Sequence, residues 1–169
     1  DYIEKIVSDV LAERRLKIVV DCGNGIPGEI APQVLEGVGC DVIPLYCDVD
    51  GNFPNHHPDP SDPANLEDLI LAVKQTGADL GMAFDGDGDR CGVVDNAGGE
   101  RFADKVGVML ARDMSALHQH GTFVVDVNST GICPTAPVLR ANGPTDNAWQ
   151  TGHPYPTPRA TPLGAPHAG

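Results

Sequence analysis

The sequence predicts an α/β fold, a three-layer α/β/α arrangement around a mixed sheet, with one complete domain followed by the start of a second. Short apolar runs typical of strands alternate with segments of helical periodicity through residues 2–95, which gives a β-α-β-α-β order and one extra strand. A glycine-rich turn follows the first apolar run, as in parallel α/β units. The 169 residues are enough to bury a substantial core.

The first elements are read from periodicity and turn residues. Residues 2–13 carry apolar side chains at helical spacing and predict an amphipathic helix. Residues 17–21 predict the first strand, and the turn at 22–28 leads into a helix that ends near Gly37 and Gly39. Residues 42–46 predict the second strand.

The next stretch predicts a long surface loop and the rest of the first domain. Residues 48–63 are rich in Pro, Asp and Asn, and Ser61 or Asp62 can cap a helix that extends to about Thr76. Strands are expected at 79–84 and 91–95, on either side of an acidic loop. We place the end of the first domain at residue 98.

Residues 99–153 predict part of a second α/β domain. A helix is expected near 104–117, with Val106, Met109 and Leu110 facing inward, then a strand at 122–127 and a short helix at 132–141. Residues 154–169 contain closely spaced prolines, which exclude a helix, so this end is expected to be extended, disordered or truncated.

Composition restricts the partners. A formal net charge of −13 argues against nucleic acid and anionic membranes, which would repel this surface. No apolar run reaches membrane-spanning length, and the first residues lack the order of a signal peptide. The five cysteines show no C-x-x-C spacing and are interpreted as small apolar core residues in a reducing compartment. A soluble cytoplasmic protein is therefore expected.

The acidic loop is the most informative segment of the chain. Asp85, Asp87 and Asp89 occupy alternate positions separated by glycines, so the backbone can curl until the three carboxylates face one ion. Three hard oxygen ligands, with remaining positions left for water or phosphate, suit Mg²⁺. Arg90 follows directly and offers a planar, permanently charged group for a phosphate oxygen.

Two other interpretations of this loop are weaker. An EF-hand requires glycine at loop position six and glutamate at position twelve, where this sequence has Arg90 and Asn96. A solvated acidic turn without an ion would hold three carboxylates together against their repulsion. A magnesium loop beside a phosphate site explains the pattern best.

Other motifs are less specific. Gly23, Gly25 and Gly28 match the dinucleotide fingerprint after a strand, but tight turns need glycine for backbone reasons alone, so an NAD-binding domain remains a weak alternative. His56 and His57 could suggest zinc, yet adjacent histidines project apart and no further ligand has suitable spacing. A role in the loop is favoured for them.

Three stretches together resemble the α-D-phosphohexomutases, in particular their bacterial phosphomannomutase/phosphoglucomutase branch. These stretches are residues 21–25, 44–60 and 83–90. The resemblance extends over roughly residues 1 to 153 and implies the second of the family's four domains, residues 1–98, followed by part of the third, residues 99–153. It also implies an enzyme that interconverts hexose 1-phosphate and hexose 6-phosphate, with mannose or glucose as the sugar, through a phosphoserine and a bisphosphorylated intermediate.

The resemblance also assigns roles to individual residues. It implies that Asp85, Asp87 and Asp89 bind Mg²⁺ as the cofactor, and that Arg90 and His153 belong to the active site. The partners it implies are a phosphorylated hexose and the remaining domains of the enzyme, so this chain alone is expected to be inactive. Asn128 and Gln150 stand where lysines are common in the family, which weakens the expected phosphate site and leaves a noncatalytic Mg²⁺- or phosphate-binding module as an alternative.

Overall fold

The computed structural model describes residues 2–10, 12–117, 125–126 and 148–149. The chain divides into two compact units, Asp1–Arg101 and Phe102–Gly169, each with its own internal packing. The first unit holds the sheet and the acidic loop, and it is described first.

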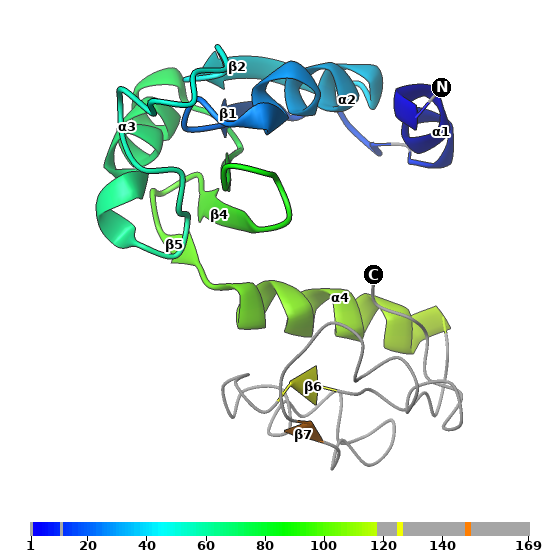
Figure 1. Ribbon diagram of the computed structural model, residues 1–169. Coiled ribbons are helices and arrows are strands. Elements are labelled where there is room, and N and C mark those ends of the chain that lie inside the picture. The colour runs from blue at the N-terminus through cyan, green and yellow to red at the C-terminus, as the bar shows by residue number, and fades with distance from the viewer. Residues whose placement is uncertain (1, 11, 118–124, 127–147, 150–169) are drawn as a thin grey trace. The chain divides into compact units, whose positions relative to one another are not determined.

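The first unit is an alternation of helices and strands that closes with two hairpins (Figure 1). In chain order its elements are α1 (Tyr2–Asp9), β1 (Lys17–Asp21), η1 (Ile26–Glu29), α2 (Ala31–Gly37), β2 (Asp41–Leu45), η2 (Pro63–Leu66), α3 (Glu67–Thr76), β3 (Leu80–Phe84), β4 (Cys91–Asp95) and β5 (Glu100–Arg101).

The five strands form one mixed sheet in the order β2-β1-β3-β4-β5. Strand β1 pairs in parallel with β2 on one side and with β3 on the other, while β4 and β5 are antiparallel additions. The parallel part requires crossover helices, and α2 and α3 supply them. This arrangement confirms the predicted mixed α/β sheet.

The sheet is buried on both faces, which makes the unit three-layered. Val19 of β1 and Ala83 of β3 pack against the α3 side with Leu69 and Val73, all at most 4% exposed. The alternate β1 residues Ile18 and Val20 lie in a separate cluster on the α2 side. Because successive strand residues point to opposite faces, an unbroken apolar run such as that of β1 is expected only in a central, doubly covered strand.

Most predicted boundaries hold to within a residue or two, and the exceptions have local causes. The single helix expected after the first turn is divided into η1 and α2, each of which has a proline in its first turn, where no backbone N–H is needed. Asp62 is the N-cap of η2, since its side chain accepts a hydrogen bond from the Ala64 N–H at 3.0 Å. The first helix ends at Asp9 instead of residue 13.

The short strand β5 was not predicted from the sequence. It forms because Asp95 closes a tight turn after β4, where its Oδ1 accepts hydrogen bonds from the backbone N–H groups of Ala97 and Gly99 at 3.0 and 2.7 Å. The chain then returns along β4 for two residues. The β4 strand itself was predicted, and its presence at 91–95 is incompatible with the second half of an EF-hand loop.

The described part of the second unit contains α4 (Ala103–Leu117) and the parallel pair β6 (Val125–Asp126) and β7 (Ala148–Trp149). The helix was predicted, but the prediction of its inward face was wrong for two of the three residues: Met109 and Leu110 are 56% and 62% exposed, whereas Val106 is half-buried. Ser115 is buried instead. Ser115 and Leu110 lie on nearly opposite sides of the helix. The helix therefore buries the side that carries Ser115 and leaves Leu110 exposed. The helix expected at 132–141 lies outside the described residues. None of the helices in the described ranges is long and apolar enough to cross a membrane.

Candidate metal centre and its supporting loops

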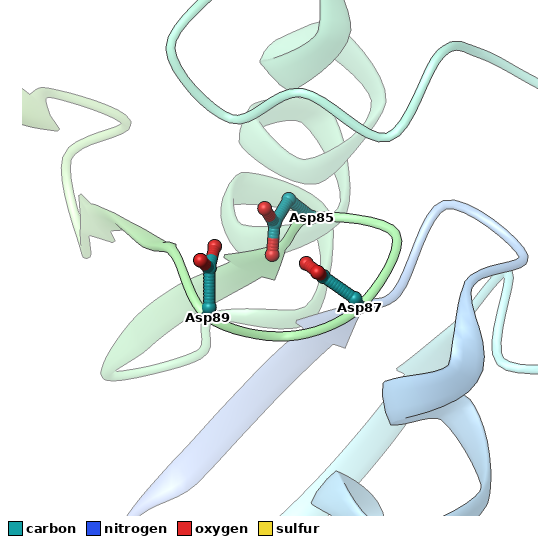
Figure 2. Close-up of side chains that lie close together, drawn as sticks. All are labelled: Asp85, Asp87 and Asp89. Atoms are coloured by element: carbon teal, nitrogen blue, oxygen red, sulfur yellow. The ribbon is translucent and has the colours of Figure 1, made fainter.

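The acidic loop, residues 85–90, connects β3 to β4 and begins directly after the last residue of β3. The backbone N–H of Asp85 donates to the carbonyl of Arg90 at 3.2 Å, so the loop closes on itself as the cap of a hairpin. Asp85 is buried, while Asp87 and Asp89 are exposed. One carboxylate oxygen from each lies within 4.8 Å of the others, and Figure 2 shows the three side chains converging across the loop.

Asp85 is held in place by three hydrogen bonds. Its Oδ1 accepts from the backbone N–H groups of Gly88 and Arg90 at 2.9 and 3.1 Å, and its Oδ2 accepts from Arg90 Nε at 2.8 Å. Burial alone would raise the pKa of the Asp85 carboxyl, but the hydrogen bonds from Arg90 outweigh burial and lower this pKa below its usual value. The buried carboxylate is therefore ionised and fixed in orientation near neutral pH.

The carboxylates of Asp87 and Asp89 repel each other. The hydrogen bond with Asp85 and the negative charge of Asp87 raise the pKa of the Asp89 carboxyl. Carboxylates held this close favour a divalent cation, which would remove the repulsion between them. The donor set consists only of carboxylate oxygens, with one buried anchor and two exposed partners, and this fits a hard ion such as Mg²⁺ that keeps part of its water shell.

Arg90 joins the acidic loop to the long loop that follows β2. Its Nη1 lies 3.3 Å from Asp59 Oδ1, in addition to the contact of its Nε with Asp85. Hydrogen bonds from the Ser61 hydroxyl and N–H lower the pKa of Asp59, so this partner is also ionised. The Arg90 side chain remains 58% exposed. The arginine that was expected to meet phosphate is thus oriented by two carboxylates and still faces solvent.

A second buried carboxylate lies at the end of β1, and sequence reasoning did not identify it as part of the site's support. The Asp21 side chain is fully buried, and its Oδ2 lies 3.0 Å from His56 Nε2, while its Oδ1 accepts the Gly23 N–H at 2.9 Å. Burial raises the pKa of Asp21, and its hydrogen-bond partners oppose that rise. The signal available in the sequence was an aspartate at the end of an otherwise apolar strand.

The long loop is anchored by this pair and by Asn24. The Asn24 side chain donates to the Asp48 carbonyl at 2.8 Å and accepts from the Asn55 side-chain amide at 2.7 Å. Asn24 itself adopts a positive φ of 62°, a conformation that asparagine tolerates better than most residues. His56 thus ties the loop to the end of β1 through Asp21. Among the described residues, Asp85, Asp87 and Asp89 form the group of side chains that could hold a metal ion.

Comparison with known proteins identifies the family. The profile of phosphoglucomutase/phosphomannomutase, alpha/beta/alpha domain II, matches residues 1–99. The chain belongs to this family.

Individual relatives agree with the profile. The chain is 51% identical over 152 residues to the phosphomannomutase/phosphoglucomutase of Pseudomonas putida, which covers 90% of this chain and 32% of that protein. It is 41% identical over 155 residues to the phosphoglucomutase of Neisseria meningitidis, covering 92% of this chain and 33% of that protein. A crystal structure of a phosphoglucomutase/phosphomannomutase family protein from Burkholderia thailandensis superposes with a TM-score of 0.90 at 40% identity, covering 99% of this chain and 36% of that one. The chain thus spans about a third of the length of the relatives it matches.

In this member of the phosphoglucomutase/phosphomannomutase family, the glycines that match the dinucleotide fingerprint have packing roles. A Cβ on Gly25 would lie 2.8 Å from the carbonyl oxygen of Gly86 in the acidic loop, and one on Gly28 would lie 2.0 Å from the carbonyl oxygen of Cys47. Gly23, with a φ of 48°, lies against Pro58. These contacts account for all three glycines without a nucleotide.

The remaining predicted site residue of this family member is His153. It lies outside the described residues, as do Asn128 and Gln150, the two positions where the family commonly has lysine. The structure thus brings together Asp85, Asp87, Asp89 and Arg90 on one loop and adds Asp59 as a second partner of the arginine.

Proposed function

We propose that this chain supplies the magnesium-binding domain of a phosphohexomutase that interconverts hexose 1-phosphate and hexose 6-phosphate, with mannose, glucose or both as the sugar. The observation that carries the proposal is the convergence of Asp85, Asp87 and Asp89 on one loop in a member of the phosphoglucomutase/phosphomannomutase family. The phosphoryl group would pass through a phosphoserine and a bisphosphorylated sugar, with the serine supplied by another part of the enzyme.

The three aspartates would hold Mg²⁺, which when bound supplies Lewis-acid stabilisation of charge on the transferring phosphoryl group. Asp85 fixes the geometry, because the hydrogen bonds from Gly88 and Arg90 keep its carboxylate from rotating. The exposed Asp87 and Asp89 leave the open side of the loop accessible to phosphate. Such a domain contributes positioning and electrostatic stabilisation, and it needs no nucleophile of its own.

Arg90 would orient the phosphate. Its exposed guanidinium carries a permanent positive charge, and its contacts with Asp85 and Asp59 restrict it to one position beside the carboxylates. Pre-ordering of this kind reduces the entropy lost when the arginine binds an anion. His153 is proposed as a second substrate contact, on the strength of the family resemblance of Thr151-Gly152-His153 alone.

The proposed partners are a phosphorylated hexose and the other domains of the enzyme, and the proposed location is the cytoplasm. These 169 residues by themselves are expected to turn over no substrate, since the phosphoserine would be donated from outside this stretch. A noncatalytic Mg²⁺-binding module remains the second candidate, favoured by Asn128 and Gln150 in place of cationic residues.

Mg²⁺ titration by calorimetry tests the metal site directly. The unsubstituted chain and the Asp41→Asn variant should bind equally, because Asp41 is an exposed aspartate of β2, outside the acidic loop, whose carboxylate lies 3.8 Å from Arg15 in a long surface ion pair. Asp87→Asn should weaken binding by about tenfold or more, which corresponds to roughly 1.4 kcal/mol or more. Equal affinity in both variants would contradict the metal site.

A chimaera tests the reaction. Residues 1–153 of this chain, which include Asn128 and Gln150, would replace the matching segment of the Pseudomonas putida relative, and conversion of mannose 1-phosphate or glucose 1-phosphate would be followed with a bisphosphate activator. The chimaera should be active with Asp41→Asn and inactive with Asp87→Asn. A folded chimaera that binds Mg²⁺ but converts neither sugar would support the noncatalytic module instead.

A further inference from the structure

Two cysteines lie in contact beside the turn that supports the acidic loop. Cys22 follows β1 and Cys47 lies two residues beyond β2, the parallel neighbour of β1. Their Sγ atoms are 3.7 Å apart. Both are free thiols, with Cys22 buried and Cys47 half-buried. Neither has a role in the metal centre, so their contact is not explained by the proposed function.

The geometry suits a covalent link between them. Both side chains belong to the same apolar cluster on the α2 face of the sheet, so they point toward one another. The hydrogen bonds between β1 and β2 continue as far as Cys22, whose N–H donates to the Leu45 carbonyl at 3.2 Å. The register that pairs Asp21 with Leu45 sets Tyr46 opposite Cys22, so Cys47 lies one residue further on, and the 3.7 Å between the sulfurs shows that the two side chains still meet. A bond would require the sulfurs to approach to about 2.05 Å, a movement that small side-chain rotations at both residues can supply.

The two thiols differ in a way that assigns them different chemical roles. The hydrogen bond between the sulfurs and burial raise the pKa of Cys22, while the hydrogen bond with Cys22 lowers the pKa of Cys47. Cys47 is also the one that solvent can reach. Because the thiolate is the reactive form, Cys47 is the thiol that an oxidant in solution meets first, and Cys22 is placed to react with it afterwards.

We propose that Cys22 and Cys47 form a reversible dithiol–disulfide site that hydrogen peroxide oxidises. The Cys47 thiolate attacks one peroxide oxygen, the O–O bond breaks, and the second oxygen leaves as hydroxide and is protonated to water. The Cys22 sulfur then displaces hydroxide from the Cys47 sulfenic acid, and the Cys22 proton converts that hydroxide to the second water. In total the two thiols lose two electrons and two protons, and one peroxide becomes two water molecules.

Only two backbone hydrogen bonds separate the cysteine pair from the acidic loop. The Cys22 carbonyl accepts the Gly25 N–H at 2.7 Å, and the next residue, Ile26, donates its N–H to the Gly86 carbonyl at 3.0 Å. On the other side, the Cys47 backbone packs against Gly28 so closely that no Cβ would fit there. The segment 22–28 packs on the acidic loop, with Cys22 at its start and Gly28, which contacts Cys47, at its end. A disulfide between Cys22 and Cys47 would thus hold both ends of this segment.

Peptide mapping of the peroxide-treated chain tests the proposal. Remaining thiols are alkylated, and the chain is then digested before aspartate and after glutamate. Glu29 and Glu36 separate Cys22 from Cys40, and Asp41 separates Cys40 from Cys47, so the three cysteines fall on different peptides. The expected product is one linked pair, Cys22 to Cys47, with a mass two hydrogens below the sum of the peptides. The link should disappear on treatment with dithiothreitol.

Variants provide the controls. Cys40→Ala should leave the Cys22–Cys47 link unchanged, because Cys40 is buried in the same cluster but has no sulfur partner among the described residues. Cys47→Ala should abolish the link and leave Cys22 fully alkylated after unfolding. Links that involve Cys40 or the exposed Cys91, or oxidation of Cys47 with Cys22 always recovered as a thiol, would overturn the proposal. Mapping of the unsubstituted chain decides the question even if a variant fails to fold.

Discussion

The substitution Gly25→Ala tests whether Gly25 is needed for close packing of its turn against the acidic loop. Gly25 has φ −78° and ψ 173°, an extended conformation that alanine adopts freely, so the substitution introduces no backbone strain of its own. Its effect should come entirely from the new Cβ, which would lie 2.8 Å from the Gly86 carbonyl oxygen and 2.9 Å from Gly86 Cα. Both neighbours are backbone atoms, which cannot rotate away as a side-chain tip can.

The expected magnitude follows from that distance. A comfortable contact needs about 3.5 Å, so the two segments must separate by roughly 0.7 Å. Overpacking of this kind costs about 1–3 kcal/mol, and the hydrogen bond from Ile26 N–H to the Gly86 carbonyl, 3.0 Å long, is weakened with it at a cost of up to ~1 kcal/mol. For a domain of this size, a loss of about 2 kcal/mol lowers the melting temperature by roughly 10 °C.

The assay is urea unfolding and thermal melting, with Mg²⁺ titration of the folded protein. Gly51→Ala is the matched control, because a Cβ on Gly51 meets no atom within 4 Å. Gly25→Ala should be less stable than this control and should bind Mg²⁺ more weakly, since Gly86 lies between Asp85 and Asp87, two of the proposed metal ligands. If Gly25→Ala and Gly51→Ala had the same melting temperature and the same Mg²⁺ affinity, the packing role assigned to Gly25 would be refuted.

Three further outcomes are expected. Leu69→Ala, which removes a fully buried side chain beneath the sheet, should lower the unfolding free energy in urea by about 3 kcal/mol while leaving Mg²⁺ affinity of the folded protein unchanged. Asp62→Ala should cost about 1 kcal/mol in the same assay, because the Ala64 N–H loses its capping acceptor, whereas Asp62→Asn should restore most of it. The pKa of Asp95 is lowered by the hydrogen bond from the Gly99 N–H, so its ionised form stabilises the fold above the unfolded pKa of about 3.9, and this contribution is lost as the pH falls through the folded pKa. The stability difference between the unsubstituted protein and Asp95→Asn should therefore shrink as the pH falls from about 5 to below 3.9, and a constant difference would contradict the role of the carboxylate charge.

Much of the fold could be predicted because local and global signals agree in the first unit. The apolar run of β1 is buried on both faces, and the predicted limits of this strand and of β4 match the structure. Such agreement between pattern and packing is usual where each element has one suitable place in the sheet. The prediction for α4 was less successful, because the side of a helix that is buried depends on its packing partners as well as on its own sequence.

The candidate metal centre was predicted because its residues are adjacent in sequence. Asp85, Asp87 and Asp89 lie on one loop, and alternation with glycine already indicates that their side chains can converge. The partnership of Arg90 with Asp59 joins residues far apart in the chain, so no local pattern could reveal it. The same holds for Asp21 and His56, whose contact depends on how the loop after β2 folds back over the end of β1.

By itself, the sequence determined the layered α/β architecture, the limits of most elements, the family and the loop that carries the three carboxylates. The architecture, the limits of the elements and the acidic loop depend on short-range patterns: apolar periodicity, capping residues and carboxylates placed two positions apart. The family was indicated by the resemblance of residues 21–25, 44–60 and 83–90 to the phosphohexomutases. Only the tertiary structure decided that Asp85 is buried and ionised, that Gly25 and Gly28 serve as contact points between segments, and that Cys22 meets Cys47. The physical reason is that burial, pKa and close contact depend on which distant segments are brought together, and that is settled when the sheet is assembled.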